Sequence, residues 1–331
     1  MNRFQGIDRL RFIGAFCIML LHTSMGDLNS GVEVQLRLLG RWAVPFYFIV
    51  TGYFLGSKFK NGSLPFVQIE KNIVKLFTVL LVSSVGYYFI DIYSKTGTIG
   101  IENIFIGTYH HLWFIGSMIF GYFIIWFLHF LNTQKYLPIL ALIILIAALF
   151  SDSYDQILGF NISYNLPRFL SSIPFMYIGI IVRRKEELIF SLFPTKKVTT
   201  ISLISLFLFG WFLQLLEAYG FWKFYHYHMY NHQLLIGSVV MGISIFLISL
   251  YLFQKEDILS NLGRRYTLFI YLYHPAIYFM MELVIFRYFS GYLSKAKMVF
   301  PIIGFLIALG LGVFLNRRFK RVFKILNGNI I

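Results

Sequence analysis

The feature that most limits how this chain can fold is a series of long apolar runs, which recurs along nearly all of its 331 residues. An α-helix rises about 1.5 Å per residue, so about 20 apolar residues cross the hydrocarbon core of a bilayer, which is about 30 Å thick. Backbone polar groups in lipid must pair with one another, as they do within a helix. The runs therefore predict an all-α integral membrane protein, a bundle of about ten transmembrane helices.

The placement of basic residues between the runs predicts how the chain is oriented. Most of the 29 Lys and Arg residues fall on one side if the amino terminus is cytoplasmic, and an even number of spans then places both termini there. We expect a multi-pass protein of the inner (cytoplasmic) membrane, with one transmembrane domain over residues 1–331 and no separate soluble domain. The predicted spans lie near residues 10–27, 38–57, 72–93, 109–131, 136–151, 166–182, 198–217, 234–253, 267–288 and 298–316.

Composition excludes other classes of protein. Charged residues make up 13% of the chain and hydrophobic residues 58%, whereas a soluble domain carries about 25% charged residues. The net charge of +15 would suit nucleic acid, but the basic residues cluster at the ends of apolar runs, where they set membrane orientation. No nucleic-acid partner is therefore expected. Cys17 is the single cysteine, so an intramolecular disulfide is excluded.

Ionisable residues inside the runs are the first functional candidates, because lipid disfavours charge. His22 follows Arg11 by eleven residues, which places its imidazole about 16 Å deeper along a helix, near mid-membrane. Arg11 at the cytoplasmic edge suits bidentate binding of a phosphate, and His22 suits proton transfer. The alternative for His22 is a histidine that only hydrogen-bonds a neighbouring helix.

A second histidine, His274, precedes Pro275 in the late run YLYHPAIYF. Counted from Arg265, His274 lies about 13 Å into the membrane, so we expect both histidines at one midplane cavity. Pro275 has no N–H group and therefore frees a backbone carbonyl at that depth. A purely structural proline kink is the alternative.

Basic residues are expected to gather at the cytoplasmic end of the bundle. Lys71 and Lys75 are four residues apart and so share one helix face. With Arg11, Arg264 and Arg265 they predict a cationic vestibule for a polyphosphate ligand. The alternative ligand is the anionic headgroups of membrane lipid.

Two further charged positions are expected near the outer face. Arg41, together with Arg168, suits either an acidic glycan or an ion pair with a carboxylate. Glu282 suits the orientation of a histidine or an acceptor hydroxyl, although such residues more often reach to the membrane interface. The sequence has no P-loop, no paired-Cys or HExxH metal signature and no G-x-S-x-G elbow. Neither a metal site nor a permanently bound cofactor is expected.

Five motifs in register resemble the membrane acyltransferase-3 family, and they cover the bundle nearly end to end. The first is IDRLRFIGAFCIMLLH, which supplies Asp8, Arg11 and His22 at the family's spacing. The others are RWAVPFYFIVTGYF at 41–54, YHHLWFIGSM with His111 and Trp113, SIPFMYIGIIVRR at 172–184, and LGRRYTLFIYLYHPAIYF at 262–279.

The sequence departs from the family pattern at two places. Thr51 stands where Ser is usual, and Lys71 with Lys75 stands where the family often has R-x-x-R. The second departure leaves the individual roles of the two lysines open, but it keeps the basic character of the site.

The resemblance implies an acyl-CoA-dependent O-acetyltransferase of the stand-alone form, without an SGNH-type esterase domain. It is similar to members that acetylate surface polysaccharides such as the enterobacterial common antigen. Acetyl-CoA is then the donor substrate, and a surface or lipid-linked glycan the acceptor. The implied residues are His22 and His274 for catalysis, Arg11, Lys71, Lys75 and Arg265 for the CoA phosphates, and His111, Trp113, Arg41 and Glu282 for the acceptor.

The competing interpretation is a polytopic transporter or flippase for a glycan or small polar solute, because a midplane histidine also suits a substrate path. Members of the family fused to racemase domains suggest a sensor or an amino-acid carrier as a further alternative, which the absence of a fused domain here disfavours. The sequence leaves open the acceptor, acetyl against another short acyl group, direct transfer against an acyl-enzyme, and the oligomeric state, for which a homodimer is one option.

Overall fold

A computed structural model describes residues 4–22, 30–59, 64–94, 107–152, 154–158, 165–192, 195–227 and 232–328. All regular secondary structure in these residues is helical, which confirms the predicted all-α class. The helices are α1 Gln5–Leu21, α2 Ser30–Gly40, α3 Ala43–Gly56, α4 Val67–Ser94, α6 Trp113–Phe130, α7 Leu137–Phe150, α8 Asp155–Leu158, α9 Asn165–Leu170, α10 Ser172–Arg184, α11 Glu186–Ser191, α12 Lys196–Tyr225, α13 Ile236–Tyr251, α14 Ile258–Phe289, α15 Leu293–Lys297, α16 Phe300–Arg318 and α17 Lys320–Leu326.

Seven helical segments in the described part of the chain are long and apolar enough to cross a membrane, namely 31–56, 67–90, 113–130, 166–184, 196–225, 258–289 and 300–318. Shorter apolar helices cover 134–150 and 236–251. Large apolar side chains such as Phe212 of α12 (57% exposed) and Leu306 of α16 (60% exposed) cover outward faces, as expected of surfaces in contact with lipid. The chain is therefore a multi-pass membrane protein, while the count of ten spans and the cytoplasmic position of both termini stay predictions.

Several helix boundaries differ from the prediction; α12, for example, covers Lys196–Tyr225 and α14 covers Ile258–Phe289. Two further differences fall near the site. Within the first predicted span, 10–27, helix α1 ends at Leu21 and His22 follows as its C-terminal cap, while residues 23–27 lie outside the described part of the chain. The sixth predicted span is divided at Ser171 into α9 and α10. Apolar runs predict where a span lies but not the residue at which its helix ends.

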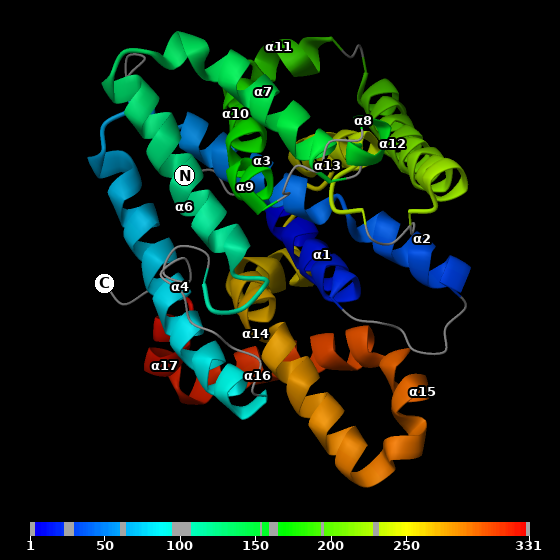
Figure 1. Ribbon diagram of the computed structural model, residues 1–331. Coiled ribbons are helices and arrows are strands. Elements are labelled where there is room, and N and C mark those ends of the chain that lie inside the picture. The colour runs from blue at the N-terminus through cyan, green and yellow to red at the C-terminus, as the bar shows by residue number, and fades with distance from the viewer. Residues whose placement is uncertain are drawn as a thin grey trace.

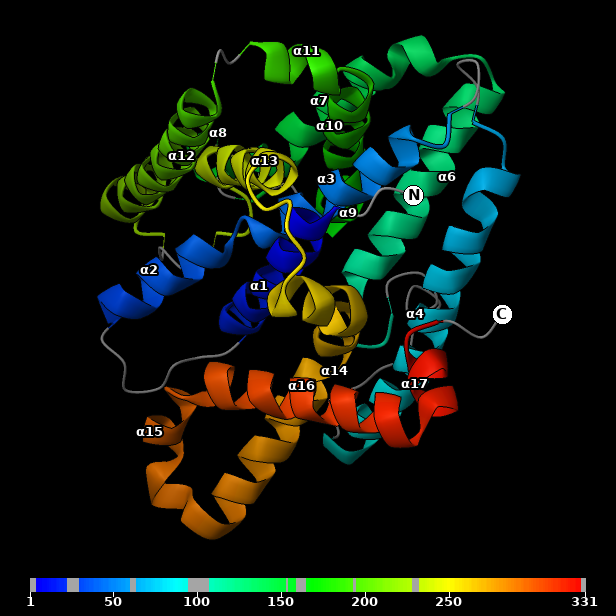
Figure 2. The ribbon, with the colours of Figure 1, turned by 180° about the vertical axis from the view of Figure 1, so that it is seen from behind.

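Helix α1 is the central element of the bundle. It packs against α2, α3, α13, α14 and α16, and Figures 1 and 2 both show it in blue at the centre, with α3 and α14 beside it. The amino-terminal half of α1 carries Asp8 and Arg11, and His22 follows its last residue. One helix thus presents an arginine and a histidine to the centre of the protein at two levels.

Two glycines allow α3 and α10 to pack backbone against backbone. A Cβ atom on Gly52 of α3 would lie 1.9 Å from the carbonyl oxygen of Met176, and one on Gly179 of α10 would lie 2.0 Å from that of Ile49. Small residues allow such close approach in membrane helices. Gly52 and Gly179 belong to two of the five motifs, so these motifs owe part of their pattern to helix packing.

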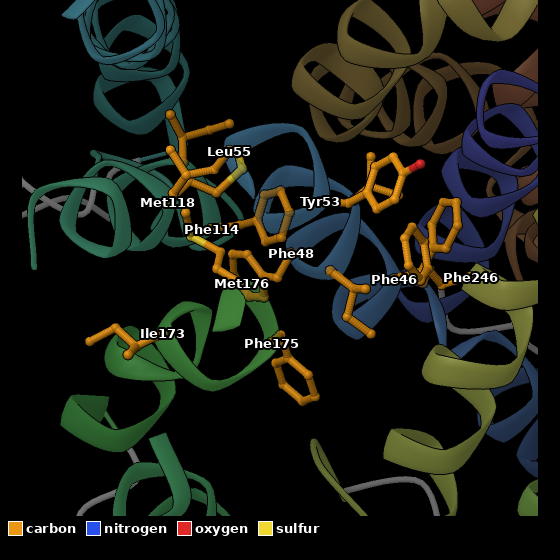
Figure 3. Close-up of a cluster of buried hydrophobic side chains, with 14 of the residues drawn as sticks. Phe46, Phe48, Tyr53, Leu55, Phe114, Met118, Ile173, Phe175, Met176 and Phe246 are labelled. Atoms are coloured by element: carbon orange, nitrogen blue, oxygen red, sulfur yellow. The ribbon is translucent and has the colours of Figure 1, made fainter. Parts of the chain in front are cut away.

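Aromatic side chains fill the core where α3 meets α6, α10 and α13. Phe46 and Phe48 of α3 are 0% exposed, and Figure 3 shows them with Phe114, Phe175 and Phe246 from the neighbouring helices. The Phe48 and Phe114 ring centroids are 4.4 Å apart. The packing holds α3 and α6 in fixed relation beside the polar centre.

Candidate functional site

Two cavities with polar residues lie on either side of the centre of the bundle. The first, named here the lysine cavity, has a volume of about 530 Å³ and is lined by the cationic residues Arg11, Lys58, Lys75 and Arg264 together with Tyr47, Thr51, Phe54, Ser57, Asn72, Leu76, Phe114, Ile115, Met118, Tyr122, Gly263, Thr267, Leu268 and Tyr271. The second, the histidine cavity, has a volume of about 320 Å³ and is lined by His22, His110, His111, Arg37, Arg41, Arg168, Ile18, Leu21, Val44, Tyr47, Trp113, Phe114, Gln233 and Tyr271.

The lysine cavity collects positive charge from three helices and a helix end. Among the described residues that line it there is no carboxylate. Two of the lining cations pair with acids that do not line the cavity, Arg11 with Asp8 at 3.4 Å and Arg264 with Glu256 at 3.7 Å. Lys58 follows the end of α3, donates to the carbonyl of Gln68 at 2.6 Å, and has its pKa lowered from the usual value by burial. Such a surface is suited to an anion with several charges.

Three histidines, His22, His110 and His111, line the other cavity, and the fully buried His274 packs against them without lining it. The His22 ring centroid lies 5.3 Å from that of His110 and 5.3 Å from that of His274, and the His111 and His274 centroids are 5.5 Å apart. His22 is exposed to the cavity, whereas His111 and His274 are 1% and 0% exposed. The structure thus brings His22 and His274 together from the two ends of the sequence.

The helix opening at Pro275 fixes the two buried histidines. Pro275 cannot donate to the carbonyl of Tyr271, which instead accepts from His274 Nδ1 at 2.8 Å. The next carbonyl, that of Leu272, accepts from His111 Nε2 at 3.0 Å and from the Tyr87 hydroxyl at 2.7 Å. A carbonyl can only accept, so these contacts assign the protonated nitrogen of each ring.

The remaining nitrogens of the buried histidines therefore carry lone pairs. His274 Nε2 and His111 Nδ1 are buried and have no hydrogen-bond partner among the described residues. A neutral imidazole held in this way can accept a proton or orient a neighbouring donor. In the described part of the chain, no group of three or more His, Cys, Asp or Glu side chains is arranged to hold a metal ion.

Arginine and tryptophan form the rest of the histidine cavity. Arg41 and Arg168 both line it, and the Arg168 guanidinium lies 4.3 Å from the centroid of the Trp113 ring. Arg37, at the end of α2, pairs with Glu33 at 3.2 Å and donates to the Leu21 carbonyl at 3.0 Å. That second bond ties α2 to the end of α1 immediately before His22.

Three residues expected at the site lie elsewhere. Lys71 is exposed and does not line the lysine cavity, although Lys75 one turn later does. Arg265 is also exposed, and its neighbour Arg264 lines the cavity instead. Glu282 is exposed and pairs with Lys297 at 2.9 Å, away from both cavities. The spacing of four residues allowed either lysine, and only the packing of α4 decides between them.

Sequence reasoning overlooked two residues of the histidine cavity, His110 and Arg37. His110 precedes His111 directly, and this pairing was the available signal. Arg37 fell in a stretch that the apolar pattern left between spans, so nothing in the sequence pointed to α2.

A larger, apolar groove of about 700 Å³ lies between α14 and α16, and the described residues that line it include no histidine and no charged side chain.

Fold and site together define a helical membrane protein with a cation-lined cavity and a histidine-lined cavity in one bundle. The family of the acyltransferase domain (acyltransferase-3) matches residues 4–317, and the chain belongs to this family. Its long apolar helices make it a multi-pass membrane protein of this family.

Two curated proteins of Enterococcus faecalis, each named amino-acid racemase, are similar to parts of the chain. One is 30% identical over 175 residues, which are 49% of this chain and 24% of the racemase. The other is 32% identical over 135 residues, 36% of this chain and 19% of the racemase. The chain thus matches about a quarter or less of the length of these relatives, and the activity in their names belongs to them. No solved structure matches the chain.

Proposed function

We propose that this protein is a membrane acyltransferase of the inner (cytoplasmic) membrane, and that it transfers an acetyl group from cytosolic acetyl-CoA to a hydroxyl of a cell-surface or lipid-linked polysaccharide. The observation that carries the proposal is the layout of α1, which brings Arg11 to the lysine cavity and His22 to the histidine cavity. A donor with an anionic head and a thioester on a long arm needs such a layout.

The donor is assigned to the lysine cavity because of its charge. Coenzyme A carries several phosphate charges, and Arg11, Lys75 and Arg264 supply guanidinium and ammonium donors for them. Lys58 adds a fourth cation. The pantetheine arm would run from this cavity along α1 toward His22, a distance of about 16 Å.

His22 is assigned as the general base. It takes the proton from the acceptor hydroxyl while the oxygen attacks the thioester carbonyl, so that a C–O bond forms and the C–S bond breaks. The proton then passes to the departing thiolate of coenzyme A. His274, whose ring lies beside that of His22, is assigned as the orienting partner.

The acceptor is assigned to the histidine cavity. Trp113 offers a flat apolar face for a sugar ring, and Arg41 with Arg168 suits hydroxyls and acidic groups on a glycan. His111, which is held by the Leu272 carbonyl, forms part of the same wall. These contacts name a class of acceptor and no particular polysaccharide.

The test compares polysaccharide from a wild-type strain and from a deletion strain by mass spectrometry. An acetyl-sized increment that disappears with the gene, returns with the wild-type copy and fails to return with His22→Ala supports both the reaction and the residue. An unchanged polysaccharide mass in the deletion strain contradicts the proposed transfer.

Transport of a glycan or a small polar solute is the second candidate, because two cavities that meet at a closed centre also suit a solute path. Proteoliposomes that hold the purified protein distinguish the two. Solute uptake without acyl-CoA favours transport, whereas product formation that depends strictly on acyl-CoA favours transfer.

A further inference from the structure

Three aromatic residues separate the two cavities. Tyr47 of α3, Phe114 of α6 and Tyr271 of α14 line both the lysine cavity and the histidine cavity. The Tyr47 and Phe114 ring centroids are 6.0 Å apart, and those of Phe114 and Tyr271 are 5.4 Å apart. We name these three residues the ring septum. Because these rings form a wall shared by both cavities, a molecule that crosses this wall must displace them.

Two of the three rings are tied to the backbone. The Tyr47 hydroxyl donates to the carbonyl of Arg11 at 2.6 Å, and the Tyr271 hydroxyl donates to the carbonyl of His111 at 2.5 Å. Each tyrosine therefore bonds to a residue of the site itself, one in the cation set and one in the histidine cluster. Moving either ring would break a buried hydrogen bond.

Phe114 is the member of the ring septum that makes no hydrogen bond. A phenyl ring has no hydrogen-bonding group, so only packing holds it, including the contact with Phe48 at a centroid distance of 4.4 Å. Figure 3 shows the Phe114 ring beside Phe48. Phe114 is 6% exposed and lies in the first turn of α6, which begins at Trp113. Displacing this ring therefore costs packing but breaks no hydrogen bond.

We propose that the ring septum is the passage through which the acyl group reaches His22, and that Phe114 sets the longest acyl chain that passes. This inference rests on the proposed function, because it takes the donor head to lie in the lysine cavity and the reaction to occur in the histidine cavity. An acetyl group is little wider than the pantetheine arm that carries it. Each further methylene group must occupy volume that the Phe114 ring fills, and overfilling a packed site is unfavourable.

The experiment uses inverted membrane vesicles from the deletion strain, which hold the native acceptor and expose the cytoplasmic side to added donor. The vesicles carry the wild-type protein or Phe114→Ala, and radiolabelled acetyl-CoA, propionyl-CoA or butyryl-CoA is supplied. Label in the polysaccharide fraction gives the rate for each donor. Equal amounts of folded protein are verified by gel filtration in detergent.

The matched control is Phe175→Ala. Phe175 is 1% exposed and stacks on Phe48 at a centroid distance of 6.4 Å, but it lines neither cavity. Both variants remove a buried phenyl ring in contact with Phe48. Only Phe114→Ala removes it from the ring septum. Phe114→Leu, a smaller change, gives the same comparison if Phe114→Ala does not fold.

We expect Phe114→Ala to raise the ratio of butyryl to acetyl transfer by at least about tenfold, since one methylene group in an apolar pocket is worth roughly 10- to 200-fold in discrimination. Phe175→Ala should leave the ratio unchanged. The inference is overturned if Phe114→Ala and Phe114→Leu keep the wild-type ratio, or if Phe175→Ala changes it equally. The proposed function fails in a different way, since the wild-type vesicles would then transfer label from none of the three donors.

Discussion

The two cavities lie at different levels along α1 and differ in chemistry. The lysine cavity holds fixed positive charge and no histidine among its described residues, whereas the histidine cavity combines three arginines with three histidines that can exchange a proton. Fixed charge binds an anion equally well before and during a reaction, whereas a titratable ring acts only where a proton moves. We therefore propose that the lysine cavity binds the donor and that the acyl transfer takes place in the histidine cavity.

The sharpest way to break this division is to remove the histidine proposed as base. His22→Ala is expected to lower kcat by about 10²- to 10⁴-fold, the usual contribution of a positioned general base, while KM for acetyl-CoA changes little. Initial rates of acetyl transfer in membrane vesicles measure both constants. Full turnover by His22→Ala would show that the assignment of the base is wrong.

The second test compares two lysines one helical turn apart. Lys75 lines the lysine cavity and Lys71 does not, although the sequence treats them alike. Lys75→Ala is expected to raise KM for acetyl-CoA by about tenfold or more with kcat unchanged, since a hydrogen bond to a charged group contributes about 1.5–3 kcal/mol. Lys71→Ala serves as the matched control. An equal rise of KM in both variants would mean that the lysines attract acetyl-CoA to the membrane surface in general, and would contradict a specific role of Lys75 in the lysine cavity.

The third test repeats the comparison with Arg264 and Arg265, which are adjacent in the sequence. Arg264 pairs with Glu256 at 3.7 Å and bonds Asn261 at 2.7 Å, so part of its charge is already engaged. Arg264→Ala is therefore expected to raise KM for acetyl-CoA by only about three- to tenfold. Arg265→Ala should give the wild-type KM in the same assay. A larger rise of KM in Arg265→Ala than in Arg264→Ala would contradict the assignment of Arg264 to the lysine cavity.

The smallest expected effect concerns acid stability beside the histidine cavity. Burial, and then the positive charge of Arg41, lowers the pKa of His232 to about 4 in the connection between α12 and α13. As the pH falls, His232 of the unfolded chain is protonated before His232 of the folded protein. The contribution of neutral His232 to the free energy of unfolding is therefore fully present above pH ~6.5 and is lost as the pH falls toward 4, by about 1.4 kcal/mol at pH 5.5.

Thermal unfolding in detergent at pH 7.5 and pH 5.5 measures this loss. His232→Leu should reduce the difference in Tm between the two pH values. His226→Asn, at an exposed histidine in the same connection, should preserve that difference. A Tm difference that is the same in His232→Leu and in the wild type would assign the acid sensitivity to other groups.

Much of the candidate site was predictable because it depends on local properties of the chain, the rise of a helix and the missing N–H group of a proline. The distance from Arg11 to His22 follows from the rise of an α-helix. The free carbonyl at Pro275 follows from the missing N–H, and the structure places it at Tyr271, where His274 donates. Neither inference needed to know which helices are neighbours.

The rest was not predictable because it depends on which face of each helix points inward. Lys71 against Lys75, and Arg265 against Arg264, differ only in the rotation of α4 and α14 about their axes. Glu282 pairs with Lys297 after the chain turns through α15, a contact that no periodicity encodes. The ring septum joins residues 47, 114 and 271 from three helices, and its rings are individually unremarkable in a chain with 20% aromatic residues.

By itself, the sequence determined that this protein is a helical bundle in a membrane, because apolar runs of this length are stable only in lipid and only as helices. It also determined the family, through five ordered motifs. Tertiary structure alone decided that the polar centre is two cavities divided by Tyr47, Phe114 and Tyr271. The physical reason is that lipid solvates all apolar faces alike, so only close packing between helices selects which side chains face each other.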